Sequence, residues 1–208
     1  EFRRVLFRSP FMIQEHFDFL QRLVEQGLAH NIEIHYNTNG TIVPSRGLDI
    51  WPHFRTVEVA FSLDDIGERF EYQRANADWQ QVQNNILTFQ QLKNTMPNLT
   101  LQCCATVNVF NIRYIDQLAN WIAHQNFDFV YWNMLHESWY LSIASLPQPA
   151  KQQISQHLKN APIPTRYREE FDRIIDFMFK GNSSDGTKLD RKSTRLNSSH
   201  VSESRMPS

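Results

Sequence analysis

The chain has 208 residues, of which 41% are hydrophobic and 21% are charged, and its formal net charge at pH 7 is −1. This composition allows one substantial core and excludes disordered and collagen-like proteins. There is no uninterrupted apolar run of the ~18–20 residues that a membrane-spanning helix needs, and residues 1–9 lack the apolar run of a signal peptide. The two cysteines, Cys103 and Cys104, are adjacent and provide no disulfide framework. We therefore expect a cytoplasmic protein without a membrane partner.

Both ends of the sequence have the pattern of translated sequencing-adapter DNA. Codons that spell residues 1–9 have a reverse complement that spells residues 190–197 when it is read one base further on. We interpret residues 1–9 and 190–208 as artefacts and residues 10–189 as an internal piece of a longer protein. Without these ends the chain loses seven of 21 basic and three of 22 acidic side chains, which leaves a net charge of about −5. No concentrated basic patch remains, so we expect no nucleic-acid partner.

Helical and extended periodicities alternate along residues 10–189. In chain order the predicted elements are a helix over 12–29, a strand over 31–38, a brief helix around 48–54, a strand over 56–63, a helix over 79–96, a strand over 99–107, a helix over 112–124 and a strand over 127–133. After Pro147 the pattern is helical again. Asp78 and Gln81 have the spacing of a helix-capping box. Helices that alternate with strands through short connections predict an α/β fold with a parallel sheet.

Three of the predicted strands are polar at every second position, whereas a parallel sheet covered on both faces should be almost continuously apolar. The polar positions are Glu33, His35, Asn37 and Asn39, then Glu58, Ala60, Ser62 and Asp64, then Gln102, Cys104, Thr106 and Asn108. If helices cover the apolar positions, the polar ones line a wet interior, as in an open barrel. An antiparallel sheet with one face in water gives the same alternation and is the structural alternative.

Several short motifs, in this order and spacing, resemble the radical S-adenosylmethionine superfamily, and within it the twitch-domain-containing proteins. They are Asn37-Thr38-Asn39-Gly40-Thr41 after one strand, Val57-Glu58-Val59-Ala60-Phe61-Ser62-Leu63-Asp64-Asp65 along the next, and Glu71-Tyr72-Gln73-Arg74 before a helix that begins with tryptophan. Pro10 would be the last residue of a Gly-Gly-Glu-Pro motif. The resemblance covers residues 10–137.

The resemblance implies a partial (β/α)6 barrel that is truncated at its N-terminal side. Residues 10–137 would supply strands 3 to 6 of this barrel, and residues 138–189 would be a helical extension. In such enzymes a [4Fe-4S] cluster reductively cleaves S-adenosylmethionine to a 5′-deoxyadenosyl radical. The cluster is held by a Cys-x-x-x-Cys-x-x-Cys motif, which these residues lack and which the family order places upstream of Pro10. Cys103 and Cys104 point to opposite sides of a strand and cannot replace it.

The family's cofactor contacts carry over to few positions here. Ser62 and Asp64 would lie near the ribose or the methionyl group of S-adenosylmethionine, and Arg74 would bind its carboxylate through a bidentate contact. Asn39 and Asn108 are weaker candidates at neighbouring strand ends. No metal ligand is expected in this part of the chain. Each of these positions also has a plain structural interpretation as a turn, a cap or a solvated side chain.

The function that the resemblance implies is that of a radical S-adenosylmethionine enzyme acting on a substrate that the sequence does not specify, a peptide or protein being one class. Residues 1–208 alone are expected to be inactive. One alternative is a relative without a cluster, which would bind a nucleotide-like ligand or a partner protein. Another is an unrelated α/β barrel enzyme such as an aldolase or hydrolase, for which the polar positions offer Glu33, Glu58 and Asp64 but no lysine.

Overall fold

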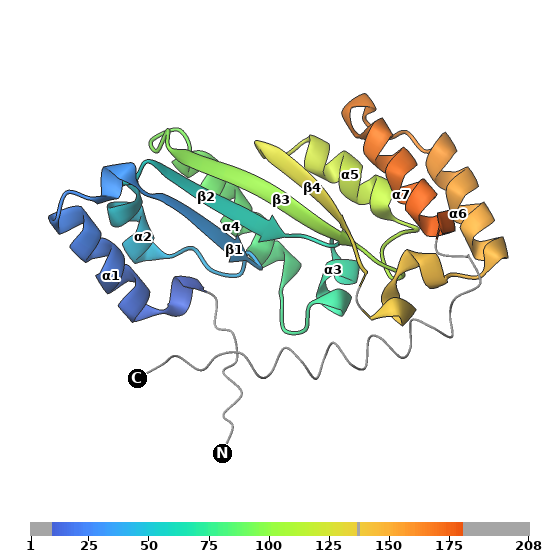
Figure 1. Ribbon diagram of the computed structural model, residues 1–208, viewed down its shortest axis with the longest axis horizontal. Helices are drawn as coiled ribbons and strands as arrows, with labels where there is room; N and C mark the ends of the chain where they lie inside the picture. Colours follow the sequence, from blue (N-terminus) through green and yellow to red (C-terminus); the bar gives the residue numbers. More distant parts are fainter. Residues whose placement is uncertain (1–9, 137, 181–208) are drawn as a thin grey trace, which may run out of the picture.

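The computed structural model describes residues 10–136 and 138–180, so the proposed adapter segments 1–9 and 190–208 lie outside the described residues. The fold is α/β: four strands, β1 (Glu33–Thr38), β2 (Thr56–Ser62), β3 (Leu99–Val107) and β4 (Phe129–Met134), form one sheet whose pairs are all parallel. The predicted α/β class and parallel sheet are confirmed, and the antiparallel alternative is wrong for these strands. Figure 1 shows the strands side by side.

Seven α-helices alternate with or follow the strands of the described chain. They are α1 (Gln14–Glu25), α2 (Ser45–Ile50), α3 (Glu68–Gln73), α4 (Trp79–Leu92), α5 (Ile115–Ala123), α6 (Gln148–Asn160) and α7 (Arg168–Lys180). In Figure 1, α1 and α2 lie at one end of the molecule and α6 and α7 at the other. No helix among the described residues is long and apolar enough to cross a membrane.

The order of the strands in the sheet is β1-β2-β3-β4, the same as their order in the chain. Each new strand is added on the same side, without the reversal that defines a doubly wound sheet. Because crossovers between parallel strands are almost always right-handed, such an order places the crossover helices on one face. The other face is therefore left without helices from these crossovers.

The alternation of polar and apolar strand residues matches this one-sided cover. Val57, Val59 and Phe61 of β2 are fully buried in the core, whereas Glu58 and Ser62, which have the opposite parity, are partly exposed. Near the middle of the sheet even polar-face positions are covered, since Ala60 and Gln102 are buried. The polar positions thus share one face, as predicted; we call it the open face.

The first helix is shorter than its periodicity predicts because Gly27 ends it. Gly27 has φ of +69°, the left-handed conformation that glycine adopts without steric cost. Its N–H donates to the carbonyl of Val24, and the Leu28 N–H donates to that of Leu23, which is the Schellman pattern of a helix end. The predicted range 12–29 therefore contains α1 and the start of a separate 3-10 turn at Ala29–Asn31.

Trp51 is the centre of the aromatic part of the core. It is fully buried, and its ring centroid lies 5.3 Å from that of Tyr36, 5.8 Å from Phe11 and 6.2 Å from Phe89. The indole N–H donates to the Tyr36 hydroxyl at 3.2 Å. Trp51 lies in the short helical segment where the sequence predicted only a brief helix, and it joins β1 to α4.

The capping box predicted at the start of α4 is only half formed. The Asp78 carboxylate accepts from the backbone N–H of Gln81 at 2.8 Å, as the pattern requires. The Gln81 side chain does not return to the Asp78 N–H; it donates instead to the carbonyl of Thr41, in the turn after β1. The Gln81 amide therefore connects α4 to the turn after β1 and does not complete the cap of its own helix.

Replacing Asp78 with alanine is expected to lower the free energy of unfolding by about 1 kcal/mol, because the Gln81 N–H loses its acceptor. Serine at the same position retains a cap acceptor and should cost only a small part of this. Urea unfolding followed by far-ultraviolet circular dichroism measures both variants. Equal midpoints for wild type and the alanine variant would show that the cap contributes nothing.

The helical pattern predicted after Pro147 is confirmed in α6 and α7. Phe171, Ile174 and Met178 of α7 are buried, as their spacing indicates. Phe171 packs edge-on against Trp132 of β4, with ring centroids 5.7 Å apart. The guanidinium of Arg168 donates to carbonyls at the end of α6, among them that of Ala161 at 2.7 Å. A cation thus caps α6 and joins the two helices.

Candidate functional site

The carboxyl ends of β2, β3 and β4 bring polar groups together on the open face. Strand register places Ser62 beside Cys104, and Cys104 beside Tyr131. In the next row Thr106 lies beside Asn133. Tyr131 is about half exposed, so this edge of the face is accessible. In parallel α/β sheets this end of the strands is where ligands bind.

Asp64 and Arg74 form an ion pair at this edge. Arg74 Nη2 donates to Asp64 Oδ2 at 2.6 Å, and the two side chains are only 25% and 14% exposed. The Arg74 guanidinium carbon also lies 5.9 Å from the centroid of the Phe70 ring in α3. Arg74 is therefore partly buried and paired, and not a fully solvated surface arginine. Arg74 directly follows α3, and its backbone N–H donates to the carbonyl of Phe70 in the last turn of that helix.

Asp64 is fixed from the sheet side as well. Its Oδ1 accepts from the backbone N–H of Thr106 at 2.8 Å, just before β3 ends. The buried Asn111 side chain donates to the carbonyls of Asp64 at 2.7 Å and Thr106 at 2.8 Å. One carboxylate thus joins the end of β2 to β3 and to Arg74. A site built in this way is held in place before any ligand arrives.

A second carboxylate, Asp65, is buried beneath this edge. Its two oxygens accept from Arg69 Nε at 3.0 and 3.1 Å, and the Ile66 N–H donates to it at 2.9 Å. Burial raises the pKa of Asp65, and these hydrogen bonds together with the Arg69 charge oppose that rise. Asp65 holds α3 in place through Arg69. Of the two adjacent acids, only Asp64 therefore lies at the carboxyl end of the open face.

The remaining predicted site residues are placed differently. Ser62 is on the open face, two residues before Asp64. Asn108 donates to the side chain of Gln73 at 3.1 Å, and its Oδ1 accepts from the Phe110 N–H. Asn39 Oδ1 accepts from the N–H and the hydroxyl of Thr41, which is a turn contact. The structure thus brings Asp64 and Arg74 into direct contact, puts Ser62 on the same face, and uses Asn108 and Asn39 in loops.

The two cysteines face opposite sides of β3, as predicted. Cys103 is fully buried in the core, and burial raises the pKa of its thiol well above the ordinary value. Cys104 is on the open face, and burial together with Glu58 raises its pKa as well. Thiolates are the form that binds metal. Within residues 10–136 and 138–180 no group of three histidine, cysteine or acidic side chains could hold a metal ion.

The sequence did not single out Asn111, Gln73 or Asp65, although they support the edge. Asp65 and Gln73 lie inside the quoted motifs, next to Asp64 and Arg74. The only local signal for Asn111 is its spacing from Asn108, whose backbone N–H donates to the Asn111 side chain at 2.9 Å. An asparagine pair three residues apart after a strand is typical of a hydrogen-bonded turn.

No protein-family model matches this sequence, and no curated protein matches it significantly.

Proposed function

We propose that this chain is part of a radical S-adenosylmethionine enzyme and contributes the carboxyl-end edge of its barrel that contacts the cofactor. The observation that carries the proposal is the Asp64–Arg74 pair at the end of the open face. Both residues belong to the motifs that carry the family resemblance, and they meet at the edge where such a fold binds ligands. The strand order without reversal and the single polar face support a partial barrel over a doubly wound sheet.

The residues at this edge fit the polar groups of S-adenosylmethionine. Arg74 uses Nη2 for Asp64, while its buried Nε has no hydrogen-bond partner among the described residues. A guanidinium with unused donors is suited to a carboxylate such as that of the methionyl group. Asp64 accepts two hydrogen bonds, and a carboxylate has about four acceptor positions, so it both orients Arg74 and retains capacity for a donor. The Ser62 hydroxyl could contact the ribose.

The described residues do not fit a [4Fe-4S] cluster. Cys103 is enclosed in the core, Cys104 is a single thiol, and both have raised thiol pKa values. When a cluster is bound in an enzyme of this class, it supplies the electron that cleaves the cofactor. We assign no part of that step to residues of this chain; their role in the proposal is to bind and orient S-adenosylmethionine.

Arg74→Lys is expected to weaken S-adenosylmethionine binding about tenfold, because an ammonium is a point charge and cannot replace the planar fork of the guanidinium. Equilibrium dialysis of the 208-residue chain with labelled S-adenosylmethionine measures the affinity. The matched control is Arg55→Lys, an exposed arginine that pairs with Glu33 at the opposite end of the sheet. No saturable binding, or equal affinities in both variants, would remove this edge from the proposal.

The gene sequence upstream of residue 10 separates the proposal from its alternatives. A Cys-x-x-x-Cys-x-x-Cys motif there supports the enzyme. Substituted cysteines, combined with binding that depends on Arg74, would indicate a relative that binds the cofactor without radical chemistry. If the upstream sequence lacks the motif and the chain does not bind S-adenosylmethionine, an unrelated α/β barrel is favoured.

A further inference from the structure

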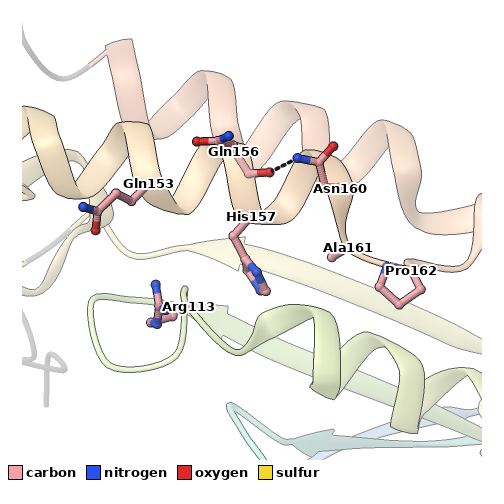
Figure 2. A pocket seen from close by; sticks show the side chains of 7 residues that line it. All are labelled: Arg113, Gln153, Gln156, His157, Asn160, Ala161 and Pro162. Carbon is pink, nitrogen blue, oxygen red and sulfur yellow. Dashed lines mark hydrogen bonds between the residues drawn. The ribbon is translucent and has the colours of Figure 1, made fainter.

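A hollow of about 550 Å³ lies between α6 and the loop that precedes α5. Arg113 lines it from the loop, and Gln153, Gln156, His157 and Asn160 line it from α6, with the Ala161–Pro162 turn closing one end. Figure 2 shows His157 pointing from α6 toward the α5 side, with Arg113 on the loop below the helix. Its volume is within the ~300–1,000 Å³ of small-molecule sites, although it is an open depression and not an enclosed cavity.

The exposed Arg113 side chain brings a positive charge to the lining. No carboxylate is among the lining residues, and Arg113 has no ion pair or hydrogen bond with another described residue. The Gln153 amide adds a neutral donor from the facing helix. Since the body of the chain has a net charge of about −5, a concave surface with an unpaired guanidinium differs from its surroundings. Such a lining favours an anion.

His157 lies next to a buried acid. Its Nε2 lies 3.3 Å from Oδ1 of Asp116, whose side chain is only 10% exposed. Apart from this ion-pair contact, Asp116 Oδ1 has no hydrogen-bond partner among the described residues. The acid lies behind the imidazole and is not part of the lining. Asp116 therefore places a negative charge next to the imidazole, and the positive charge on the loop side of the hollow is that of Arg113.

Both walls of the hollow are fixed by contacts elsewhere. The loop with Arg113 is pinned by Asn111, whose side chain bonds the ends of β2 and β3. The end of α6 is pinned by Arg168, which donates to its last carbonyls. The loop and α6 thus form two walls that are fixed from outside the hollow, with Arg113 on the loop side.

We propose that this hollow binds a small molecule through an oxyanion group, with Arg113 as the charged contact and His157 and Gln153 as further donors. Carboxylates and phosphates share the acceptor geometry that a guanidinium recognises. The site is separate from the Asp64–Arg74 edge and from the cofactor proposed there. It does not depend on the proposed function, since all of its residues lie in the loop before α5 and in α6.

Inorganic phosphate and succinate, titrated separately into the 15N-labelled 208-residue chain, test the site by nuclear magnetic resonance. We expect saturable shifts of the backbone signals of Arg113 and His157 with at least one of the two anions. Arg113→Gln should weaken binding about tenfold, and Arg113→Lys, which retains the charge but loses the planar fork, should weaken it by a smaller factor. The matched control is Arg22→Gln, which removes the same charge from the exposed surface of α1.

The two anions distinguish the source of the oxyanion. Saturation by phosphate alone indicates a phosphate-bearing ligand, and saturation by succinate alone a carboxylate-bearing one. Equal shifts with chloride at the same ionic strength would overturn the proposal, because they would reflect general screening. Unchanged affinity in Arg113→Gln, with circular dichroism showing a folded chain, would also overturn it. His157→Gln, which retains a donor but loses the aromatic ring, should bind more weakly than wild type and more strongly than Arg113→Gln.

Discussion

Replacing Trp51 with alanine is expected to lower the free energy of unfolding by about 3–5 kcal/mol, the range for truncating a large buried aromatic side chain. The indole is fully buried against Phe11, Tyr36 and Phe89, so its loss opens a cavity that those rings cannot fill. The Tyr36 hydroxyl also loses a donor. Urea unfolding followed by circular dichroism measures the change. Trp139→Ala is the matched control, because Trp139 is 62% exposed and should cost about 0.5 kcal/mol or less.

Gly47 provides an independent check on the packing of Trp51. A Cβ at Gly47 would lie 2.8 Å from Cε2 of the Trp51 ring, closer than two carbons can approach. Gly47→Ala should therefore destabilise the wild-type chain by about 1–3 kcal/mol. In the Trp51→Ala background the ring is gone and only Cγ of Pro44, at 3.2 Å, remains close, so Gly47→Ala should cost clearly less than in the wild-type chain. Additive effects of the two substitutions would contradict the packing described here.

Asp64→Ala is expected to cost about 2–3 kcal/mol of unfolding free energy, somewhat less than a fully buried ion pair because Arg74 is 25% exposed. The substitution leaves Arg74 without its anion and the Thr106 N–H without its acceptor. Adding Arg74→Met to this variant should restore part of the stability, because the unpaired cation is then removed as well. Urea unfolding of the single and double variants measures both effects.

A surface pair provides the comparison for Asp64. Asp18 and Arg46 are 2.8 Å apart but 49% and 39% exposed, so Asp18→Ala should change the unfolding free energy by about 1 kcal/mol or less. If Asp64→Ala cost no more than Asp18→Ala, the carboxyl edge would not be held by this ion pair. The Arg74 guanidinium would then lack the orientation on which the proposed cofactor contact rests.

The sequence by itself determined the four strands, most of the helices and the sidedness of the sheet, but it did not predict α3 (Glu68–Gln73). The strand predicted over 99–107 is β3 with the same bounds, and the alternation of Val57, Val59 and Phe61 with Glu58 and Ser62 predicted which face is covered. These features depend on side-chain periods of 2 and 3.6 residues, which are local properties of the chain. Element ends were less well predicted, because caps and turns such as that at Gly27 decide them.

Only the tertiary structure decided which polar groups meet. The Arg74 guanidinium reaches Asp64 over ten residues, Asn111 bonds the Asp64 carbonyl over 47, and the Gln81 amide bonds Thr41 rather than its own helix cap. The tertiary structure also places Arg113 opposite α6. Such contacts depend on how loops fold back onto strand ends, and residue types at fixed spacing do not specify that path. A buried polar side chain forms hydrogen bonds with whichever groups lie close to it, and the packing of the whole chain determines which groups those are.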